Sequence, residues 1–125
     1  MKPEQKDGVP LVKATLRVIG GKWTVRILWH LRSGARRYGA LRQLMPEVSE
    51  KVLVQKLRIL EENDIIARDV LSEKPLKITY RFTAYGETLV PVFQALCDWG
   101  EKHLSRIESE NIPGLEQEVK QAEQP

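Results

Sequence analysis

Lys51, Gln55 and Arg58 recur at spacings of four and three residues, which places them on one face of a helix. The amide of Gln55 has the geometry to bond adenine, and the guanidinium of Arg58 has the geometry to bond guanine. Val54 flanks this face and could contact a thymine methyl group. The set predicts recognition of base edges in the major groove of DNA. An ordinary solvent-facing helix is the alternative, and these four residues alone leave it open.

The basic residues are concentrated in the N-terminal two thirds of the chain. Residues 1–83 carry 17 Lys and Arg against 9 Asp and Glu, whereas residues 84–125 carry 3 against 8, for a net charge of +3. Such an asymmetry favours a polyanionic partner for the basic part. The residues expected to contact phosphates precede a predicted helix or lie on a predicted hairpin: Arg36, Arg37, Lys74, Lys77 and Arg81. Ser49, before another predicted helix, is also expected to contact DNA.

Enzyme chemistry has little support in the sequence. The chain contains no glycine-rich phosphate loop, no nucleophile elbow and no cysteine pair at zinc-binding spacing. Cys97 and His103 lie six residues apart, and His30 falls in another helix, so no nucleophile and base are paired. We therefore expect no enzyme, no cofactor and no metal. Cys97 is interpreted as a small apolar residue in a helix contact, with thiol sensing as the alternative.

The expected location is the cytoplasm of a bacterium. A single cysteine cannot form an internal disulfide, and no run of about 18 apolar residues could span a membrane. The polar segment 1–8 does not resemble a signal peptide and is expected to be a flexible N-terminus. The acidic tail 108–125 is expected to be disordered. Between them, residues 9–107 are expected to form one domain.

Helical periodicity positions the candidate DNA-binding residues. Apolar residues predict helices over 11–19, from Trp23 to about Ser33, and from Tyr38 to a break at Pro46. Ser49 is then the expected N-cap of a fourth helix that ends near residue 63. Its inward face would carry Leu53, Leu57 and Leu60. A helix, a three-residue break and a capped helix form a helix-turn-helix arrangement.

The periodicity changes after residue 64. Leu76, Ile78, Tyr80 and Phe82 alternate with polar residues, as in a half-buried strand. Residues 65–71 are the expected partner strand, and 72–75 the connecting loop. Thr83 is the expected N-cap of a helix over 84–107, with a kink at Pro91. That helix would be about 35 Å long. The expected fold is mainly α with a small two-stranded β-hairpin: a winged helix-turn-helix with a long C-terminal dimerisation helix.

Several segments resemble the HxlR-type regulators, a branch of the winged-helix transcription factors related to MarR-type proteins. The segment Val18-Ile19-Gly20-Gly21-Lys22-Trp23-Thr24 is similar to the family's characteristic opening. The resemblance continues through residues 37–42, 49–53, 57–61 and 80–86. It ends with Leu96-Cys97-Asp98-Trp99-Gly100, so it covers about residues 9–107.

The resemblance implies a homodimer that binds double-stranded DNA and regulates transcription at a near-palindromic operator. By position, the recognition helix would be 49–63 and the wing 72–77. Helices 11–19 and 84–107 would pack across the twofold axis. Repression is the expected sign of regulation, and any small-molecule effector stays open. The residues expected at the dimer interface lie on these two helices: Val12, Leu16, Leu89, Phe93, Leu96, Cys97, Gly100 and Leu104.

Three positions depart from the family pattern. Many members carry a cysteine directly before the N-terminal proline, where this chain has Val9, so a redox switch of that type is not expected. Glu50 and Val54 stand where members often carry uncharged polar residues. They keep a second hypothesis open, a winged-helix module that binds an acidic protein partner. A thiol enzyme built around Cys97 is a third hypothesis.

Overall fold

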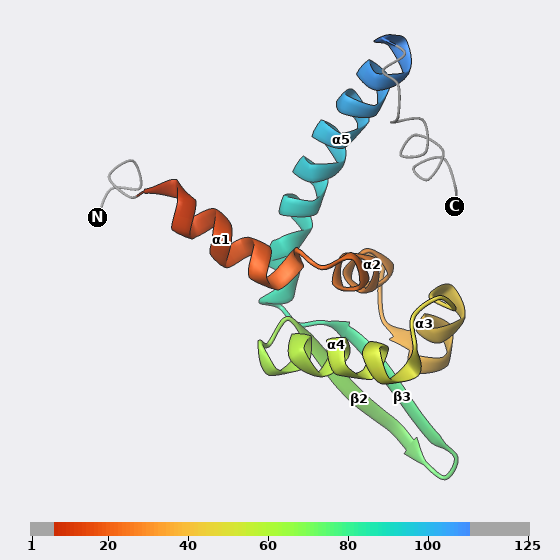
Figure 1. The fold of residues 1–125 in the computed structure, drawn as a ribbon. Helices are drawn as coiled ribbons and strands as arrows, with labels where there is room; N and C mark the ends of the chain where they lie inside the picture. The colour runs from red at the N-terminus through yellow and green to blue at the C-terminus, as the bar shows by residue number, and fades with distance from the viewer. Residues whose placement is uncertain (1–6, 111–125) are drawn as a thin grey trace. The chain divides into compact units, whose positions relative to one another are not determined.

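The computed structural model describes residues 7–110, which form parts of two compact units divided after Glu87. The helix-turn-helix and the sheet belong to the first unit, and the long C-terminal helix belongs to the second (Figure 1). The elements in chain order are α1 Gly8–Ile19, α2 Lys22–Leu31, β1 Arg36–Arg37, α3 Tyr38–Leu44, α4 Glu50–Glu62, β2 Ile66–Glu73, β3 Leu76–Phe82, the 3-10 helix η2 Gly86–Leu89 and α5 Val90–Glu110.

The core of the first unit lies where α4 contacts both α2 and β2. Leu53, Leu57 and Leu60 are buried along one side of α4, which confirms the predicted inward face. Ser49 caps this helix, since its hydroxyl accepts a hydrogen bond from the Val52 N–H at 3.2 Å. The other buried apolar side chains of the helix-turn-helix lie on α2, α3 and the turn: Ile27, Leu28, Leu31, Leu41, Met45 and Val48.

The sheet has three antiparallel strands in the order β1-β3-β2, so the prediction of a two-stranded hairpin was incomplete. The missed strand is β1, in which Arg36 pairs with Tyr80 and Arg37 with Thr79. Because β1 contains only two residues, it has no alternation that a sequence pattern could detect. It fixes the segment before α3 to the edge of β3.

The connecting loop is shorter than predicted. β2 continues to Glu73, so the turn consists of Lys74 and Pro75 rather than of residues 72–75. The pairing shifts between Val70 and Ser72, which leaves Leu71 as an extra residue in β2. A bulge of this kind breaks the period of two, which explains why the alternation in this strand is poor.

The first helix begins at Gly8, and the Asp7 carboxylate caps it by accepting the Val9 N–H at 3.0 Å. Asp7 and Gly8, which were expected in a flexible N-terminus, therefore belong to the start of this helix, and residues 1–6 lie outside the described residues. At the other end, the Gly20 N–H donates to the Leu16 carbonyl at 2.7 Å. A Cβ at position 20 would lie 2.3 Å from that carbonyl oxygen, so glycine is required there.

The long C-terminal helix does not begin at residue 84 as predicted. Thr83 accepts the Gly86 N–H at 2.8 Å, but the turn that it caps is η2, and α5 begins only at Val90. Pro91 therefore lies in the first turn of α5, where a backbone N–H would have no acceptor within the helix. The predicted kink is wrong. The helix extends to Glu110, so residues 108–110 of the expected tail are helical and the rest lie outside the described residues.

Candidate nucleic-acid interface

The outer face of α4, defined here as Lys51, Val54, Gln55, Arg58 and Ile59, lies opposite the buried leucines. All five side chains are exposed, and they include the four residues predicted to form the DNA-binding face of this helix. Ile59 was not predicted, although it follows Gln55 by one helical turn, and it is 45% exposed. The face combines two cations, an amide and apolar groups, which is the chemistry that direct recognition of base edges uses.

The N-terminus of α4 uses two of its polar residues for the helix itself. The Ser49 hydroxyl oxygen accepts the cap hydrogen bond, and its proton stays available to donate to a phosphate oxygen. Glu50 lies in the first turn, where a carboxylate is favoured by the helix dipole. Burial, followed by the negative charge of Glu50, raises the pKa of Tyr38 at the start of α3.

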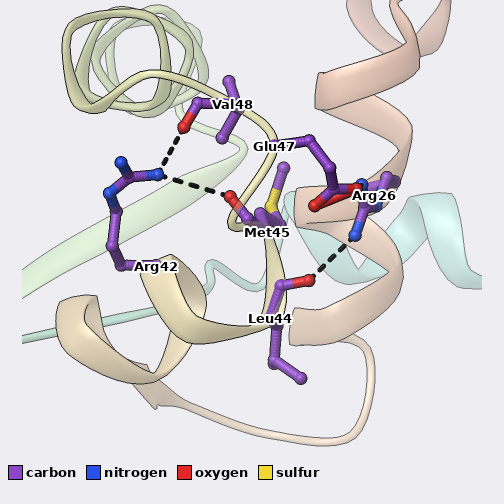
Figure 2. A network of polar contacts seen from close by, with 6 residues as sticks. All are labelled: Arg26, Arg42, Leu44, Met45, Glu47 and Val48. Atoms are coloured by element: carbon purple, nitrogen blue, oxygen red, sulfur yellow. Dashed lines mark hydrogen bonds and ion pairs between the residues drawn. The ribbon is translucent and has the colours of Figure 1, made fainter.

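Two arginines hold the turn between α3 and α4, and the sequence analysis missed both (Figure 2). Arg42 donates from Nη1 to the carbonyls of Met45, at 3.3 Å, and of Val48. The last carbonyls of a helix have no partner within it, so the turn needs such donors. The sequence could therefore have predicted that the turn needs side-chain donors, but it could not show which arginines supply them.

The second arginine connects the turn to α2. Arg26 donates from Nη2 to the Leu44 carbonyl at 2.8 Å, and its Nη1 forms an ion pair with Glu47 (Figure 2). The hydrogen bond from Arg26 holds the pKa of Glu47 below its usual value. We call these contacts of Arg26 and Arg42 the turn network. The network connects α2, the end of α3 and the residue before the Ser49 cap, so it sets where α4 begins.

Replacing Arg42 with methionine is expected to lower the free energy of unfolding by about 1–3 kcal/mol, because two carbonyls lose a charged donor. Methionine keeps much of the apolar stem of the side chain, so the loss reports on the hydrogen bonds. Urea unfolding followed by circular dichroism measures it. Gln43→Met, at the exposed neighbouring position, is the matched control and should change stability by less than about 0.5 kcal/mol. Equal unfolding midpoints for the two variants would contradict the assignment.

The other basic residues predicted to contact phosphate differ in their availability. Lys74, Lys77 and Arg37 are exposed. Arg36 is half-buried, and its Nε donates to the His30 carbonyl at 2.7 Å, which ties β1 to the end of α2. Burial, followed by Arg26, Arg36 and Arg32, lowers the pKa of His30.

Arg81 also has a partner within the hairpin. Its Nε lies 2.9 Å from the Asp69 carboxylate on the neighbouring strand, and both side chains are partly exposed. The ion pair leaves less of the Arg81 charge free for a phosphate. Arg36 and Arg81 are therefore weaker phosphate candidates than Lys74 and Lys77.

The residues predicted at a dimer interface are divided between the two units. In α1, Val12 and Leu16 are 58% and 54% exposed, respectively. In α5, Leu96 and Cys97 are exposed, Phe93 is buried, and Gly100 and Leu104 are intermediate. Leu89, at the end of η2 just before α5, is also intermediate. Trp99, which was not among the predicted interface residues, is 66% exposed and stacks on His103, with ring centroids 4.9 Å apart. Both helices thus present apolar side chains to solvent in the single chain.

Residues 7–110 lack two other kinds of site. No group of three or more His, Cys, Asp or Glu side chains there could hold a metal ion. None of the helices in that range combines the length and the apolar character that crossing a membrane demands.

Comparison with known proteins gives consistent results. Residues 18–108 match the family described as HxlR-like helix-turn-helix. Over 108 residues the chain is 42% identical to the HTH-type transcriptional regulator YtcD of Bacillus subtilis, with 86% of each protein covered. It is 32% identical over 93 residues to the HTH-type transcriptional regulator YodB of the same organism, which covers 74% of this chain and 83% of YodB. These relatives are transcriptional regulators rather than enzymes.

Solved structures show the same fold. The crystal structure of the regulator ytcD aligns with a TM-score of 0.72 at 43% identity, over 76% of this chain and 97% of that one. The redox regulator HypR in its reduced form aligns with a TM-score of 0.73 at 36% identity, over 78% of this chain and 97% of that one. The fold is therefore a winged helix-turn-helix with a three-stranded sheet.

Proposed function

Since the chain belongs to the HxlR-like helix-turn-helix family and is a DNA-binding transcriptional regulator, we propose that it binds a specific duplex site as a homodimer. The proposed sign of regulation is repression, because a bound dimer would block the DNA that it covers. The proposed compartment is the bacterial cytoplasm. The observation that carries the proposal is the outer face of α4, which stands opposite three buried leucines and combines groups suited to base edges.

In this proposal α4 enters the major groove. Arg58 bonds a guanine and Gln55 an adenine, while Val54 and Ile59 contact thymine methyl groups and Lys51 contacts a phosphate. The turn network supports this placement because it fixes the start of α4 relative to α2 and α3. A recognition helix held in this way needs no ordering of its backbone when it binds.

The phosphate contacts are assigned according to the availability of each side chain. Arg37, Lys74 and Lys77 are exposed and carry the main contacts. Ser49 contributes its hydroxyl proton. Arg36 and Arg81 make weaker contacts, because each already donates to a partner within the protein. These contacts set affinity and register without sequence information.

The proposed dimer covers the apolar side chains of α1 and α5. Val12 and Leu16 on α1, and Leu96 and Trp99 on α5, are each more than half exposed in the single chain. Large apolar side chains clustered on a surface mark an interaction site. A twofold dimer places two α4 helices about one helical turn, roughly 34 Å, apart, and hence predicts a near-palindromic operator.

Replacing Leu96 with lysine is expected to raise the dimer dissociation constant by about 100-fold or more, because the charge would be buried in the contact. Leu96 is 53% exposed in the single chain, so the monomer should fold normally. Analytical ultracentrifugation measures the association. Ser105→Lys adds the same charge on the opposite side of α5, where Ser105 is exposed, and should leave the dimer intact. A dimer that tolerates Leu96→Lys would remove α5 from the interface.

The function is tested by selecting duplexes from a random library with the purified full-length chain. Fluorescence anisotropy then compares the enriched duplex, the chain's own upstream intergenic DNA and a scrambled duplex at about 50 and about 200 mM salt. We expect preference for the enriched duplex and weaker binding at the higher salt. Equal binding to enriched and scrambled duplexes would contradict a sequence-specific regulator.

A further inference from the structure

The closed end of the β2–β3 hairpin carries apolar side chains outside the core. We call residues 70–77 the wing tip. Val70, Leu71 and Leu76 are 46%, 58% and 62% exposed, respectively, whereas Tyr80 and Phe82 further along β3 are only 7% and 8% exposed. Figure 1 shows this end of the hairpin projecting beyond α3 and α4 of the same unit. An exposed apolar cluster at the end of a projecting hairpin indicates a contact with a partner.

Strand pairing explains how these side chains are directed. Val70 pairs with Ile78, so the two lie on the sheet face that also carries Tyr80, and Leu76 continues the same alternation along β3. The apolar face of the sheet thus extends past the core to the turn. Leu71 is the extra residue of the bulge, and bulges bend a strand and redirect its side chains. The turn itself contains Pro75, a further apolar group.

The charges of the hairpin favour a nucleic acid as the partner. Residues 66–82 carry four cations, Arg68, Lys74, Lys77 and Arg81, and two anions, Asp69 and Glu73. Asp69 is neutralised by Arg81. Of the other charged residues, Lys74 and Lys77 directly flank Pro75 and Leu76, so these apolar side chains stand between groups that would contact phosphates.

The hairpin extends from the core by a distance comparable to the spacing of adjacent grooves. From Tyr80 to Leu76 the strand advances four residues, or about 14 Å. With α4 in the major groove, the neighbouring minor groove lies about half a helical turn, or roughly 17 Å, along the duplex. The hairpin and α4 belong to the same unit, so the two contacts are made together.

We propose that Leu76, assisted by Leu71, inserts from the minor groove between two base pairs of the operator and bends it. This inference rests on the proposed function. Leucine and proline are among the side chains that unstack a base step in this way and kink the duplex toward the major groove. The step under the wing tip would be a flexible pyrimidine–purine step, since its deformation costs least. Specificity would then extend to a position that α4 does not contact.

The test measures DNA bending by energy transfer between dyes on the two ends of the enriched duplex, with the full-length chain bound. The wild type is expected to shorten the end-to-end distance, and Leu76→Ser to restore the distance of the free duplex. Affinity should fall by only about tenfold, because the cost of unstacking the base step offsets part of the binding free energy that the inserted side chain contributes. Leu76→Ile keeps an apolar wedge and should keep the bend.

Lys77→Ala is the complementary control. It should reduce the salt dependence of binding and leave the bend, whereas Leu76→Ser should leave the salt dependence unchanged. Leu76 is 62% exposed and Lys77 is also exposed. Leu76→Ser and Lys77→Ala should therefore both unfold at the same urea concentration as the wild type. A straight duplex bound with normal specificity by the wild type, or an unchanged bend with Leu76→Ser, overturns the wedge and leaves the proposed function standing. Failure of the wild type to prefer any duplex overturns both.

Discussion

Replacing Gly86 with alanine is expected to lower the free energy of unfolding by about 3 kcal/mol or more. Gly86 is buried, and a Cβ there would lie 1.9 Å from the Ile65 carbonyl oxygen and 2.9 Å from Cδ1 of Phe82. The Ile65 carbonyl accepts the Thr83 N–H at 3.1 Å, so it cannot move away without losing that bond. The methyl group therefore forces apart the segment after α4 and the segment after β3.

Urea unfolding of the two proteins measures this effect. Gly39→Ala is the matched control, since it makes the same change in α3, where a Cβ would meet nothing within 4 Å. Alanine is the better helix former, so this variant should gain about 0.5–1 kcal/mol. If Gly86→Ala unfolds at the same urea concentration as Gly39→Ala, the close approach to Ile65 is wrong.

Replacing Arg58 with alanine is expected to weaken binding to the enriched duplex by about 1–3 kcal/mol, or roughly 5- to 150-fold. The side chain is exposed on the outer face of α4, and its truncation removes the bidentate bond to guanine. The preference for guanine at that position should also be lost, because alanine cannot distinguish the bases. Anisotropy titrations against duplexes with each base pair at the affected position test both parts.

Two lysine variants separate base recognition from general charge. Lys102→Ala removes one positive charge from an exposed position on α5 and should leave operator binding unchanged. Lys77→Ala should weaken all duplexes alike, since phosphate contacts carry no sequence information. If Arg58→Ala also weakens every duplex by the same factor, Arg58 contacts the backbone rather than a base.

The sequence by itself determined the helical part of the first unit and the inner and outer faces of α4. The spacing of Leu53, Leu57 and Leu60 and the cap at Ser49 depend on interactions within one or two helical turns. Such local interactions leave a regular pattern in the sequence. For the same reason the alternation from Leu76 to Phe82 located β3 correctly.

Only the tertiary structure decided the features that depend on distant segments. The strand β1 exists because Arg36 and Arg37 pair with β3, more than 40 residues further along the chain. The long helix α5 begins later than predicted because Gly86 packs on the carbonyl of Ile65. Ile65 precedes the β2–β3 hairpin in the chain, and Gly86 follows it. No periodicity records a contact of this kind, because only one or two residues on each side take part.

The same reason applies to the positioning of the candidate site. Arg26 and Arg42 are indistinguishable by residue type from the chain's other arginines, yet their donors meet the free carbonyls of the turn. Which arginine meets which carbonyl depends on how the turn is placed when α2 packs on α4 and α3 packs on the sheet. The sequence thus determined which side chains α4 presents, and the tertiary structure determined how α4 is held.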